Sequence, residues 1–280
     1  MDISEDSIMK KTVLITGASR GVGEATALLF AAKGWNVVAS MRSPEKETGL
    51  ERHENMHLVR LDVEDTASIE GAVRQTQEKF GRIDLLINNA GFGQYGLFEA
   101  LTPEQIRKQF DVNVFGTMNV MRSVLPHFRA NKGGMIINVS SAGGRIGIPL
   151  ISMYVASKFA LEGFSEAISY ELASQNIVLK LVEPGGIATS FHEVSTEKYA
   201  TGAGLADYDA YVAAFNQRFA AMYENLASAE QVAETIYAAA TDGEDTLRYV
   251  VGDDAKGWIE ARTHMADKDF ARHMREFFKA

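Results

Sequence analysis

The chain of 280 residues contains no cysteine. Disulfide bonds, thiolate metal sites and thiol nucleophiles are therefore excluded together. The six histidines show no spacing typical of a ligand set, so we expect no bound metal. The sequence also has no internal repeat, low-complexity tract or flexible linker long enough to mark a domain boundary. These absences favour a single domain whose chemistry depends on groups other than thiols and metals.

Basic residues and long apolar runs are also scarce. The chain has 28 Lys and Arg against 37 Asp and Glu, which gives a net charge of -9. An acidic protein repels nucleic acids and anionic membranes, so its partners are expected to be small molecules or proteins. No run of about 18 uncharged apolar residues occurs, and the polar N-terminus lacks the apolar core of a signal peptide. We predict a cytoplasmic protein that binds neither nucleic acid nor membrane.

Short β-branched apolar runs alternate with longer amphipathic stretches along the chain. Four of these runs (VLIT, WNVVAS, DLLIN and MIINV) are apolar on both faces, as strands covered by helices on both sides require. The pattern predicts an α/β protein with a doubly wound parallel sheet, the Rossmann fold. The predicted strands are 12–16, 36–41, 56–61, 84–88, 135–139, 178–182 and 248–251.

Three further segments complete the predicted organisation. The main domain, 11–255, is expected to lie between an N-terminal extension, 1–10, and a C-terminal helical extension, 256–280. Capping-box patterns at 102–105 and 228–231 predict two helix starts. In 189–226 the strand and helix alternation gives way to an aromatic stretch, which either packs its aromatics in the core or forms a mobile flap over an apolar substrate.

A glycine-rich turn follows the first predicted strand and precedes an apolar helix. This order suits a dinucleotide, because backbone N–H groups and the positive helix end face the pyrophosphate, whereas side chains would block it. Three glycines at this junction exceed the needs of a plain tight turn. The predicted phosphate-loop residues, spaced G-x-x-x-G-x-G, are Gly17, Ser19, Arg20, Gly21, Val22 and Gly23.

The end of the second strand indicates which nicotinamide cofactor binds. An acidic residue there would hold the ribose 2'-hydroxyl of NAD, but the chain reads Ser40-Met41-Arg42-Ser43. The guanidinium of Arg42 could bind a 2'-phosphate, and Arg20 in the glycine loop could approach from the other side. The pair favours NADP over NAD.

A tyrosine and a lysine four residues apart, Tyr154 and Lys158, open a predicted long helix. Their side chains share one helix face, and a lysine ammonium near a phenol favours the phenolate. We therefore expect a lowered pKa for Tyr154, which would make it usable as an acid or base nearer neutral pH.

With these motifs in order, the sequence resembles the short-chain dehydrogenase/reductase family over residues 11 to about 190. The resemblance implies that Tyr154 is the general acid/base and that Lys158 binds the nicotinamide ribose and depresses the tyrosine pKa. It also implies that Ser141 hydrogen-bonds the substrate oxygen and that Asn113 anchors a water in the proton relay. The motifs are TGASRGVG at 16–23, Asp62, NNAG at 88–91, NVFG at 113–116, Ser141, YVASK at 154–158 and PGGIAT at 184–189.

The same resemblance extends the cofactor site beyond the glycine loop. It implies an adenine contact after the third strand, an adenosine contact after the fourth, and a loop that fixes the nicotinamide carboxamide. These residues are Asp62, Val63, Asn89, Ala90, Gly91, Pro184, Gly185, Ile187 and Thr189. The chain is longer than the common form of the family, so expectations about substrate transfer poorly to its C-terminal part.

The predicted function is hydride transfer between NADP(H) and a carbonyl or secondary alcohol. A largely apolar set of candidate pocket walls suggests a hydrophobic ketone or aldehyde: Phe92, Gln94, Tyr95, Ile146, Ile148, Met153, Phe191 and the segment 189–226. A non-catalytic NADP-binding sensor and an NAD-dependent epimerase or dehydratase are the alternatives. The family pairs through long helices, so 103–128 and 154–175 predict a homo-oligomer, either a dimer or a tetramer.

Overall fold

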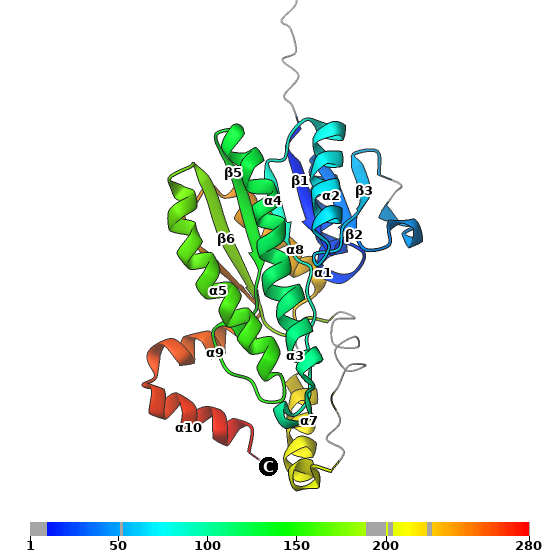
Figure 1. The fold of residues 1–280 in the computed structure, drawn as a ribbon. Coiled ribbons are helices and arrows are strands. Elements are labelled where there is room, and N and C mark those ends of the chain that lie inside the picture. Colours follow the sequence, from blue (N-terminus) through cyan, green and yellow to red (C-terminus); the bar gives the residue numbers. More distant parts are fainter. Residues whose placement is uncertain (1–9, 51–52, 189–199, 201–203, 223–225, 280) are drawn as a thin grey trace, which may run out of the picture.

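Seven parallel strands form one sheet in the computed structural model of the protein, which describes residues 10–50, 53–188, 200, 204–222 and 226–279 (Figure 1). The strand order is β3-β2-β1-β4-β5-β6-β7. The strands are β1 (Thr12–Thr16), β2 (Asn36–Met41), β3 (Met56–Arg60), β4 (Leu85–Asn88), β5 (Gly134–Val139), β6 (Ile177–Pro184) and β7 (Arg248–Val251). The predicted doubly wound fold is confirmed, and the predicted strand limits differ from these only at the ends.

Helices cover both faces of the sheet (Figure 1). One face packs against α1 and α8, and the other against α2, α4 and α5. The helices are α1 (Gly21–Ala32), α2 (Thr66–Phe80), α3 (Pro103–Phe110), α4 (Thr117–Ala130), α5 (Ser152–Ala173), α7 (Asp209–Met222), α8 (Ala229–Thr241), α9 (Asp253–His264) and α10 (Asp267–Phe277). Strands that are apolar on both sides are buried by this arrangement, as their composition requires.

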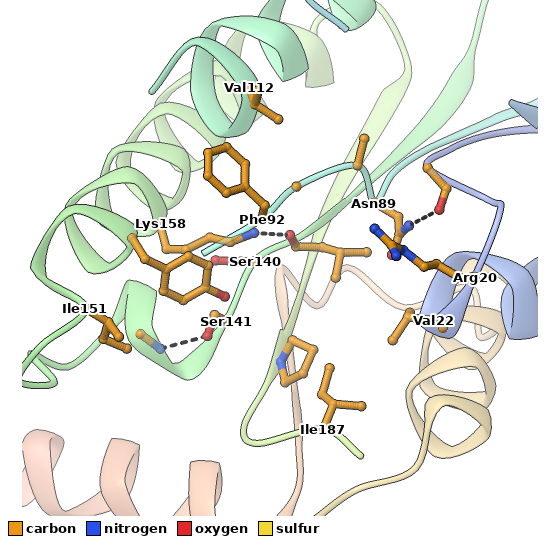
Figure 2. A pocket seen from close by; sticks show the side chains of 18 of the residues that line it. Arg20, Val22, Asn89, Phe92, Val112, Ser140, Ser141, Ile151, Lys158 and Ile187 are labelled. Atoms are coloured by element: carbon orange, nitrogen blue, oxygen red, sulfur yellow. Dashed lines mark hydrogen bonds between the residues drawn. The ribbon is translucent and has the colours of Figure 1, made fainter. Parts of the chain in front are cut away.

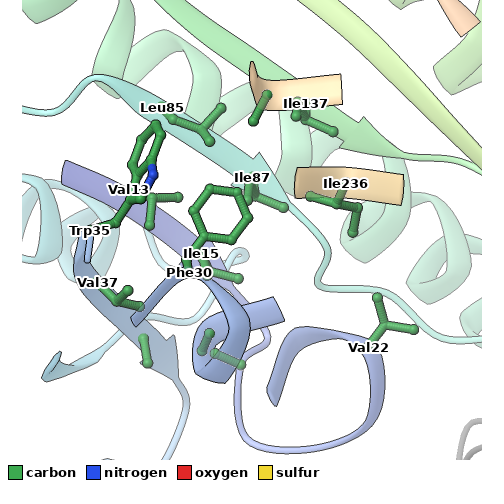
Figure 3. Packing of buried hydrophobic residues seen from close by; sticks show 14 of the residues in the cluster. Val13, Ile15, Val22, Phe30, Trp35, Val37, Leu85, Ile87, Ile137 and Ile236 are labelled. Atoms are coloured by element: carbon green, nitrogen blue, oxygen red, sulfur yellow. The ribbon is translucent and has the colours of Figure 1, made fainter. Parts of the chain in front are cut away.

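The apolar side chains of alternate strand positions enter two separate cores. In the first core, Phe30 of α1 packs with Val13, Ile15 and Ile87 from the sheet (Figure 3). The Phe30 ring meets Trp35 edge-on, with the ring centroids 5.1 Å apart. These two layers fix the carboxyl ends of the strands, where the functional residues lie.

Both predicted capping boxes are confirmed. Thr102 and Gln105 cap α3 reciprocally, and Ser228 and Gln231 cap α8 in the same way. The predicted single helix over 103–128 is wrong in its middle, where a π-helical turn, η4 (Asp111–Gly116), separates α3 from α4. A Cβ at Gly116 would lie 2.7 Å from the Val63 side chain, so the wider turn passes close to the segment after β3.

The C-terminal part forms an arm of two helices, α9 and α10, that reaches α7 (Figure 1). Phe278, directly after α10, packs in a small core with Phe215 of α7 and Leu150. Tyr211, Phe215 and Phe219 of the predicted flap therefore pack in this helical core, whereas Tyr208 is exposed. Segments 189–199, 201–203 and 223–225 of that flap lie outside the described residues.

Candidate active site

A cavity of about 350 Å³ opens at the carboxyl ends of the strands. Neighbouring strands β1 and β4 continue into connections on opposite sides of the sheet, and such a switch point leaves a crevice. Figure 2 shows Lys158 and Ser141 on one side of this cavity, with Arg20, Val22 and Asn89 on the other. The predicted site residues that line it are Gly17, Ser19, Arg20, Gly21, Val22, Arg42, Asp62, Val63, Asn89, Ala90, Gly91, Ser141, Tyr154, Lys158, Pro184, Gly185 and Ile187.

The glycine loop leaves the start of α1 open to the cavity. Gly17 and Gly21 adopt φ of 67° and 58°, which other residues rarely tolerate. A Cβ at Gly23 would lie 2.2 Å from the Gly17 carbonyl oxygen, so only glycine fits there. The Asn89 amide donates to the carbonyl oxygens of Thr16 and Gly17, both at 3.0 Å, and ties the loop to β4. Gly23 itself does not line the cavity but lets α1 pack against the loop.

Two arginines flank the far end of the cavity. Arg42 directly follows β2, and Arg20 is the residue that precedes α1. The Asp62 carboxylate accepts a hydrogen bond from the backbone N–H of Glu64 at 3.2 Å, which shapes the turn after β3. A 2'-phosphate on the ribose of a dinucleotide would therefore meet positive charge from two separate elements.

The three catalytic candidates converge near the middle of the cavity. Tyr154 lies in the first turn of α5, and Lys158 follows one turn later. The Lys158 ammonium donates to the Val139 carbonyl oxygen at 2.8 Å and lies 5.7 Å from the centre of the Tyr154 ring. Ser141 follows β5, and its hydroxyl oxygen accepts from the Gly143 N–H at 3.0 Å. Helix and strand thus hold the three groups from different directions.

Burial changes the acid–base properties of this pair. Burial raises the pKa of Tyr154 to about 12, although a hydrogen bond with Ser141 opposes the change. Burial lowers the pKa of Lys158 to about 8, and the nearby Glu162 carboxylate opposes this decrease. The expected lowering of the tyrosine pKa is therefore wrong for the protein without ligands. The cost of removing a phenolate from water outweighs the stabilisation that the neighbouring Lys158 ammonium offers, because that ammonium donates its hydrogen bond to the Val139 carbonyl oxygen.

Asn113 lies behind the cavity wall, in the π-helical turn. Its amide oxygen accepts from the Phe92 N–H at 3.1 Å, and its amide nitrogen donates to the Phe92 carbonyl oxygen at 2.9 Å. The same nitrogen donates to the Ser157 hydroxyl at 3.2 Å. The Asn113 side chain therefore fastens the segment after β4 to α5. Its role as the anchor of a relay water stays a prediction.

The loop after β6 is held by a residue that sequence reasoning missed. One carboxylate oxygen of Asp254, in the first turn of α9, accepts from the Gly186 N–H at 2.8 Å. The other carboxylate oxygen is buried without a hydrogen-bond partner, and a Cβ at Gly185 would lie 2.3 Å from it. The predicted residue Thr189, further along this loop, lies outside the described residues. Sequence resemblance ends near residue 190, so only the acidic start of α9 could have drawn attention to Asp254.

The candidate pocket walls are only partly correct. Of them, Phe92, Tyr95 and Ile148 line the cavity, and Phe191 lies outside the described residues. Gln94, Ile146 and Met153 do not line it. Gln94 and Ile146 are buried instead, and the Gln94 N–H donates to the Gln109 side chain at 2.6 Å. Phe219 and Leu226, which also line the cavity, belong to the segment 189–226 that was predicted to contribute walls, whereas sequence reasoning missed Ile151 and Trp258.

A cluster of charged side chains lies next to the turn after β5 and the loop after β6. Arg145, four residues after Ser141, contacts the Glu183 carboxylate at 3.1 Å, and Glu183 directly precedes Pro184. Arg248 of β7 contacts Glu183 at 3.3 Å and Glu162 of α5 at 2.9 Å. Burial raises the pKa of Glu183, helped by the Glu162 charge and opposed by Arg145. The cluster connects three segments that carry site residues: the Ser141 turn, α5 and the loop after β6.

The described residues contain no group of three or more His, Asp or Glu side chains that could hold a metal ion. None of the helices in the described part of the chain is long and apolar enough to cross a membrane.

Comparison with known proteins establishes the family. Residues 11–200 match the short chain dehydrogenase family, so the chain belongs to it. It is 38% identical over 239 residues to an uncharacterized oxidoreductase of Schizosaccharomyces pombe, covering 84% of this chain and 99% of that protein. It is 40% identical over 190 residues to the 3-ketodihydrosphingosine reductase of Bacteroides thetaiotaomicron, covering 68% of this chain and 69% of the reductase.

Solved structures give the same result. A short chain dehydrogenase from Burkholderia cenocepacia in complex with NADP has a TM-score of 0.75 and 26% identity, covering 95% of this chain and 97% of the other. A 3-ketoacyl-(acyl-carrier-protein) reductase from Brucella melitensis complexed with NADH has a TM-score of 0.73 and 26% identity, covering 86% and 96%. The protein is thus an oxidoreductase of this family, whose structurally similar members include both NADP and NADH complexes.

Proposed function

We propose that the protein is an NADP(H)-dependent reductase of hydrophobic carbonyl compounds, able to oxidise the corresponding secondary alcohols. The observation that carries this proposal is the meeting of Ser141, Tyr154 and Lys158 in one cavity with the glycine loop. The positive φ angles of the loop and the open start of α1 leave room for a pyrophosphate against backbone N–H groups.

When bound, NADPH supplies the hydride that adds to the carbonyl carbon of the substrate. The Ser141 hydroxyl donates a hydrogen bond to the carbonyl oxygen, on which negative charge develops. The Tyr154 phenol then gives its proton to that oxygen, which completes the alcohol. With a pKa near 12, Tyr154 is protonated at neutral pH and therefore ready to donate. The ammonium of Lys158 stabilises the phenolate that remains.

A pH dependence follows from Lys158. Its pKa is lowered to about 8, so it is charged below that pH and neutral above it. The reductive rate at limiting cofactor, which reports the ionisation of the free protein, should be constant below about pH 8 and should fall as pH rises through that value. The oxidative rate should rise with pH, because only the phenolate of Tyr154 accepts the alcohol proton. Stopped-flow absorbance of NADPH in both directions measures these profiles.

NADP is proposed over NAD because Arg20 and Arg42 both line the far end of the cavity and no acidic residue follows β2 directly. The NADP complex of the structurally similar Burkholderia protein supports this proposal, and the NADH complex of the Brucella reductase requires a direct test. Calorimetric titration should show NADPH binding at least about tenfold tighter than NADH, a difference of about 1.4 kcal/mol. Arg42→Ala should reduce that difference in affinity. Equal affinities of the unaltered protein for NADPH and NADH would refute the proposed preference for NADP.

Three variants test the mechanism in an assay of NADPH consumption with a panel of ketones and aldehydes. Tyr154→Phe should keep the fold and cofactor affinity while turnover falls on the order of 10² to 10⁴-fold. Lys158→Ala should weaken cofactor binding as well as turnover, whereas Ser141→Ala should lower turnover alone. Cofactor binding without any turnover would favour the sensor alternative, and turnover that leaves the cofactor unchanged would favour the epimerase or dehydratase alternative.

We also propose a homo-oligomer. Phe159 and Tyr170 of α5 are 46% and 71% exposed and lie about three helical turns apart, hence on the same side of that helix. Phe115 of the π-helical turn is 52% exposed. Burying these rings would require a second copy of the chain to pack on this side. Light scattering at micromolar concentration should show a dimer or tetramer, and Phe159→Glu should shift it toward monomer.

A further inference from the structure

Five aromatic rings form an unbroken chain from the C-terminal arm to α7. The Trp258 ring of α9 lies 6.2 Å from Phe277 of α10, and Phe277 lies 4.9 Å from Phe278. Phe278 stacks on Phe215 of α7 at 5.5 Å, and Phe215 stacks on Phe219 at 5.1 Å. Only the two end members of this aromatic chain, Trp258 and Phe219, line the active-site cavity. The three inner rings therefore fix the positions of two cavity walls without touching the cavity.

The aromatic chain lies beside the catalytic residues. Helix α9 contacts the turn Ala142–Gly144, which directly follows Ser141. Ile148 packs both with the core around Phe215 and with the cluster that contains Tyr154. Trp258 and Phe219 line the same cavity as Ser141 and Tyr154, beside which the carbonyl group must lie.

Charged side chains are concentrated elsewhere in the cavity. Among its described lining residues, Lys158 and Asp254 are the charged groups near the catalytic turn. One carboxylate oxygen of Asp254 accepts from the Gly186 N–H, and the other is buried without a hydrogen-bond partner. The others lie at the glycine loop, after β2 and β3, and on α3: Arg20, Arg42, Asp62, Glu64 and Lys108. The described walls of the substrate end are apolar or aromatic: Tyr95, Ile148, Ile151, Ile187, Phe219, Leu226 and Trp258.

We propose that Trp258 and Phe219 form an apolar subsite that binds the hydrocarbon portion of the substrate beside Tyr154. This inference rests on the proposed reductase function and specifies its substrate class: uncharged carbonyl compounds with an extended alkyl chain or ring system. An anionic group beside these aromatic walls would lose hydration and would lie near the Asp254 carboxylate, which is one helical turn before Trp258 in α9. An alkyl chain there removes apolar surface from water and gains affinity with each methylene.

The test is a series of n-alkan-2-ones, from butan-2-one to dodecan-2-one. Trp258 is one of two tryptophans in the chain, and the other, Trp35, is buried in the core behind α1. In a Trp35→Phe background with saturating NADP⁺, the fluorescence of Trp258 should change on ketone binding. Affinity should rise about two- to fourfold per methylene until the subsite is filled. If Trp35→Phe fails to fold, the difference between the unaltered protein and Trp258→Phe gives the same signal.

Two substitutions at Trp258 separate the subsite from general damage. In NADPH-consumption assays, Trp258→Ala should raise the KM of long ketones on the order of tenfold or more and that of butan-2-one far less, flattening the dependence on chain length. Trp258→Phe, which keeps an aromatic wall, should preserve that dependence. Phe277→Ala should flatten it partly, because this ring supports Trp258 from outside the cavity.

The outcomes distinguish this inference from the proposed function. If Trp258 reports chain-length-dependent binding but no ketone consumes NADPH, the apolar subsite stands and the reductase assignment falls. If ketones are reduced with the same dependence on chain length in Trp258→Ala as in the unaltered protein, the subsite is refuted and the reductase assignment stands. Absence of any Trp258 response to ketones that are turned over also overturns the subsite.

Discussion

Removal of the Asp254 carboxylate should weaken cofactor binding. Asp254 lies in α9, which follows the last strand of the sheet, but its side chain holds the loop after β6. In Asp254→Ala the Gly186 N–H loses its charged acceptor at 2.8 Å, and the loop after β6 loses its attachment to the arm. A hydrogen bond to a charged group contributes about 1.5–3 kcal/mol. If the loop must be ordered again on binding, that cost corresponds to a rise of about 10- to 150-fold in the Kd for NADPH.

The chain offers a matched control for this change. Asp253 precedes Asp254 in the same helical turn, but its side chain is 102% exposed and contacts only Lys256 at 3.4 Å. Asp253→Ala removes the same charge from the start of α9, yet an exposed ion pair contributes little. Titration of NADPH fluorescence should give a Kd within about twofold of the unaltered protein for Asp253→Ala. Equal Kd values for the two variants would refute the proposed clamp on the loop.

Two further predictions concern the glycine loop and a buried charge pair. Gly23→Ala would place a Cβ 2.2 Å from the Gly17 carbonyl oxygen, so NADPH affinity measured by fluorescence should fall at least about tenfold. The control is Gly71→Ala in α2, which should leave the affinity unchanged because the nearest atom to the new Cβ, on the Arg74 side chain, is 3.9 Å away. Asp242→Ala leaves the ammonium of Lys180, whose side chain is 1% exposed, without its charged partner at 2.7 Å, and should lower the free energy of unfolding by about 2 kcal/mol in urea titrations. Burial opposes a lower pKa for Asp242, but hydrogen bonds from Lys180 and Tyr249 lower that pKa to about 2. The stabilisation by the Asp242 carboxylate is therefore present above the ordinary carboxyl pKa and is lost as pH falls through about 2. An Asp242→Ala variant whose stability depends on acid pH as in the unaltered protein would contradict this prediction.

Features encoded within short segments were predictable from the sequence. The glycine loop, the Tyr154 and Lys158 pair and both capping boxes depend on residues close together in the chain, and each has a distinct spacing. The parallel sheet followed from apolar runs that require cover on both faces. Because the carboxyl ends of parallel strands share one edge of the sheet, the predicted sheet also indicated that motifs far apart in the chain lie in one cavity.

Features that depend on contacts between distant segments were not predictable. Asp254 and Gly186 are 68 positions apart, and no local pattern links an acidic helix start to a glycine in another loop. The raised pKa of Tyr154 depends on how completely the folded chain removes water from the phenol, which spacing along one helix does not reveal. Whether a residue lines a cavity, as Trp258 does, or packs beside it, as Gln94 does, is likewise decided by tertiary packing.

The π-helical turn at Asp111–Gly116 has a consequence for insertions and deletions in this protein. It accommodates one more residue per turn than a regular helix would, and each residue of a regular helix turns the chain by about 100°. Deleting one residue there, so that the turn became regular, would rotate α3 by that angle relative to α4. Gln109, whose side chain donates to the Phe92 carbonyl oxygen at 2.8 Å, would then point away from the wall that it supports. The number of residues in this short stretch therefore matters to the cavity wall in addition to the identities of Asn113 and Gly116.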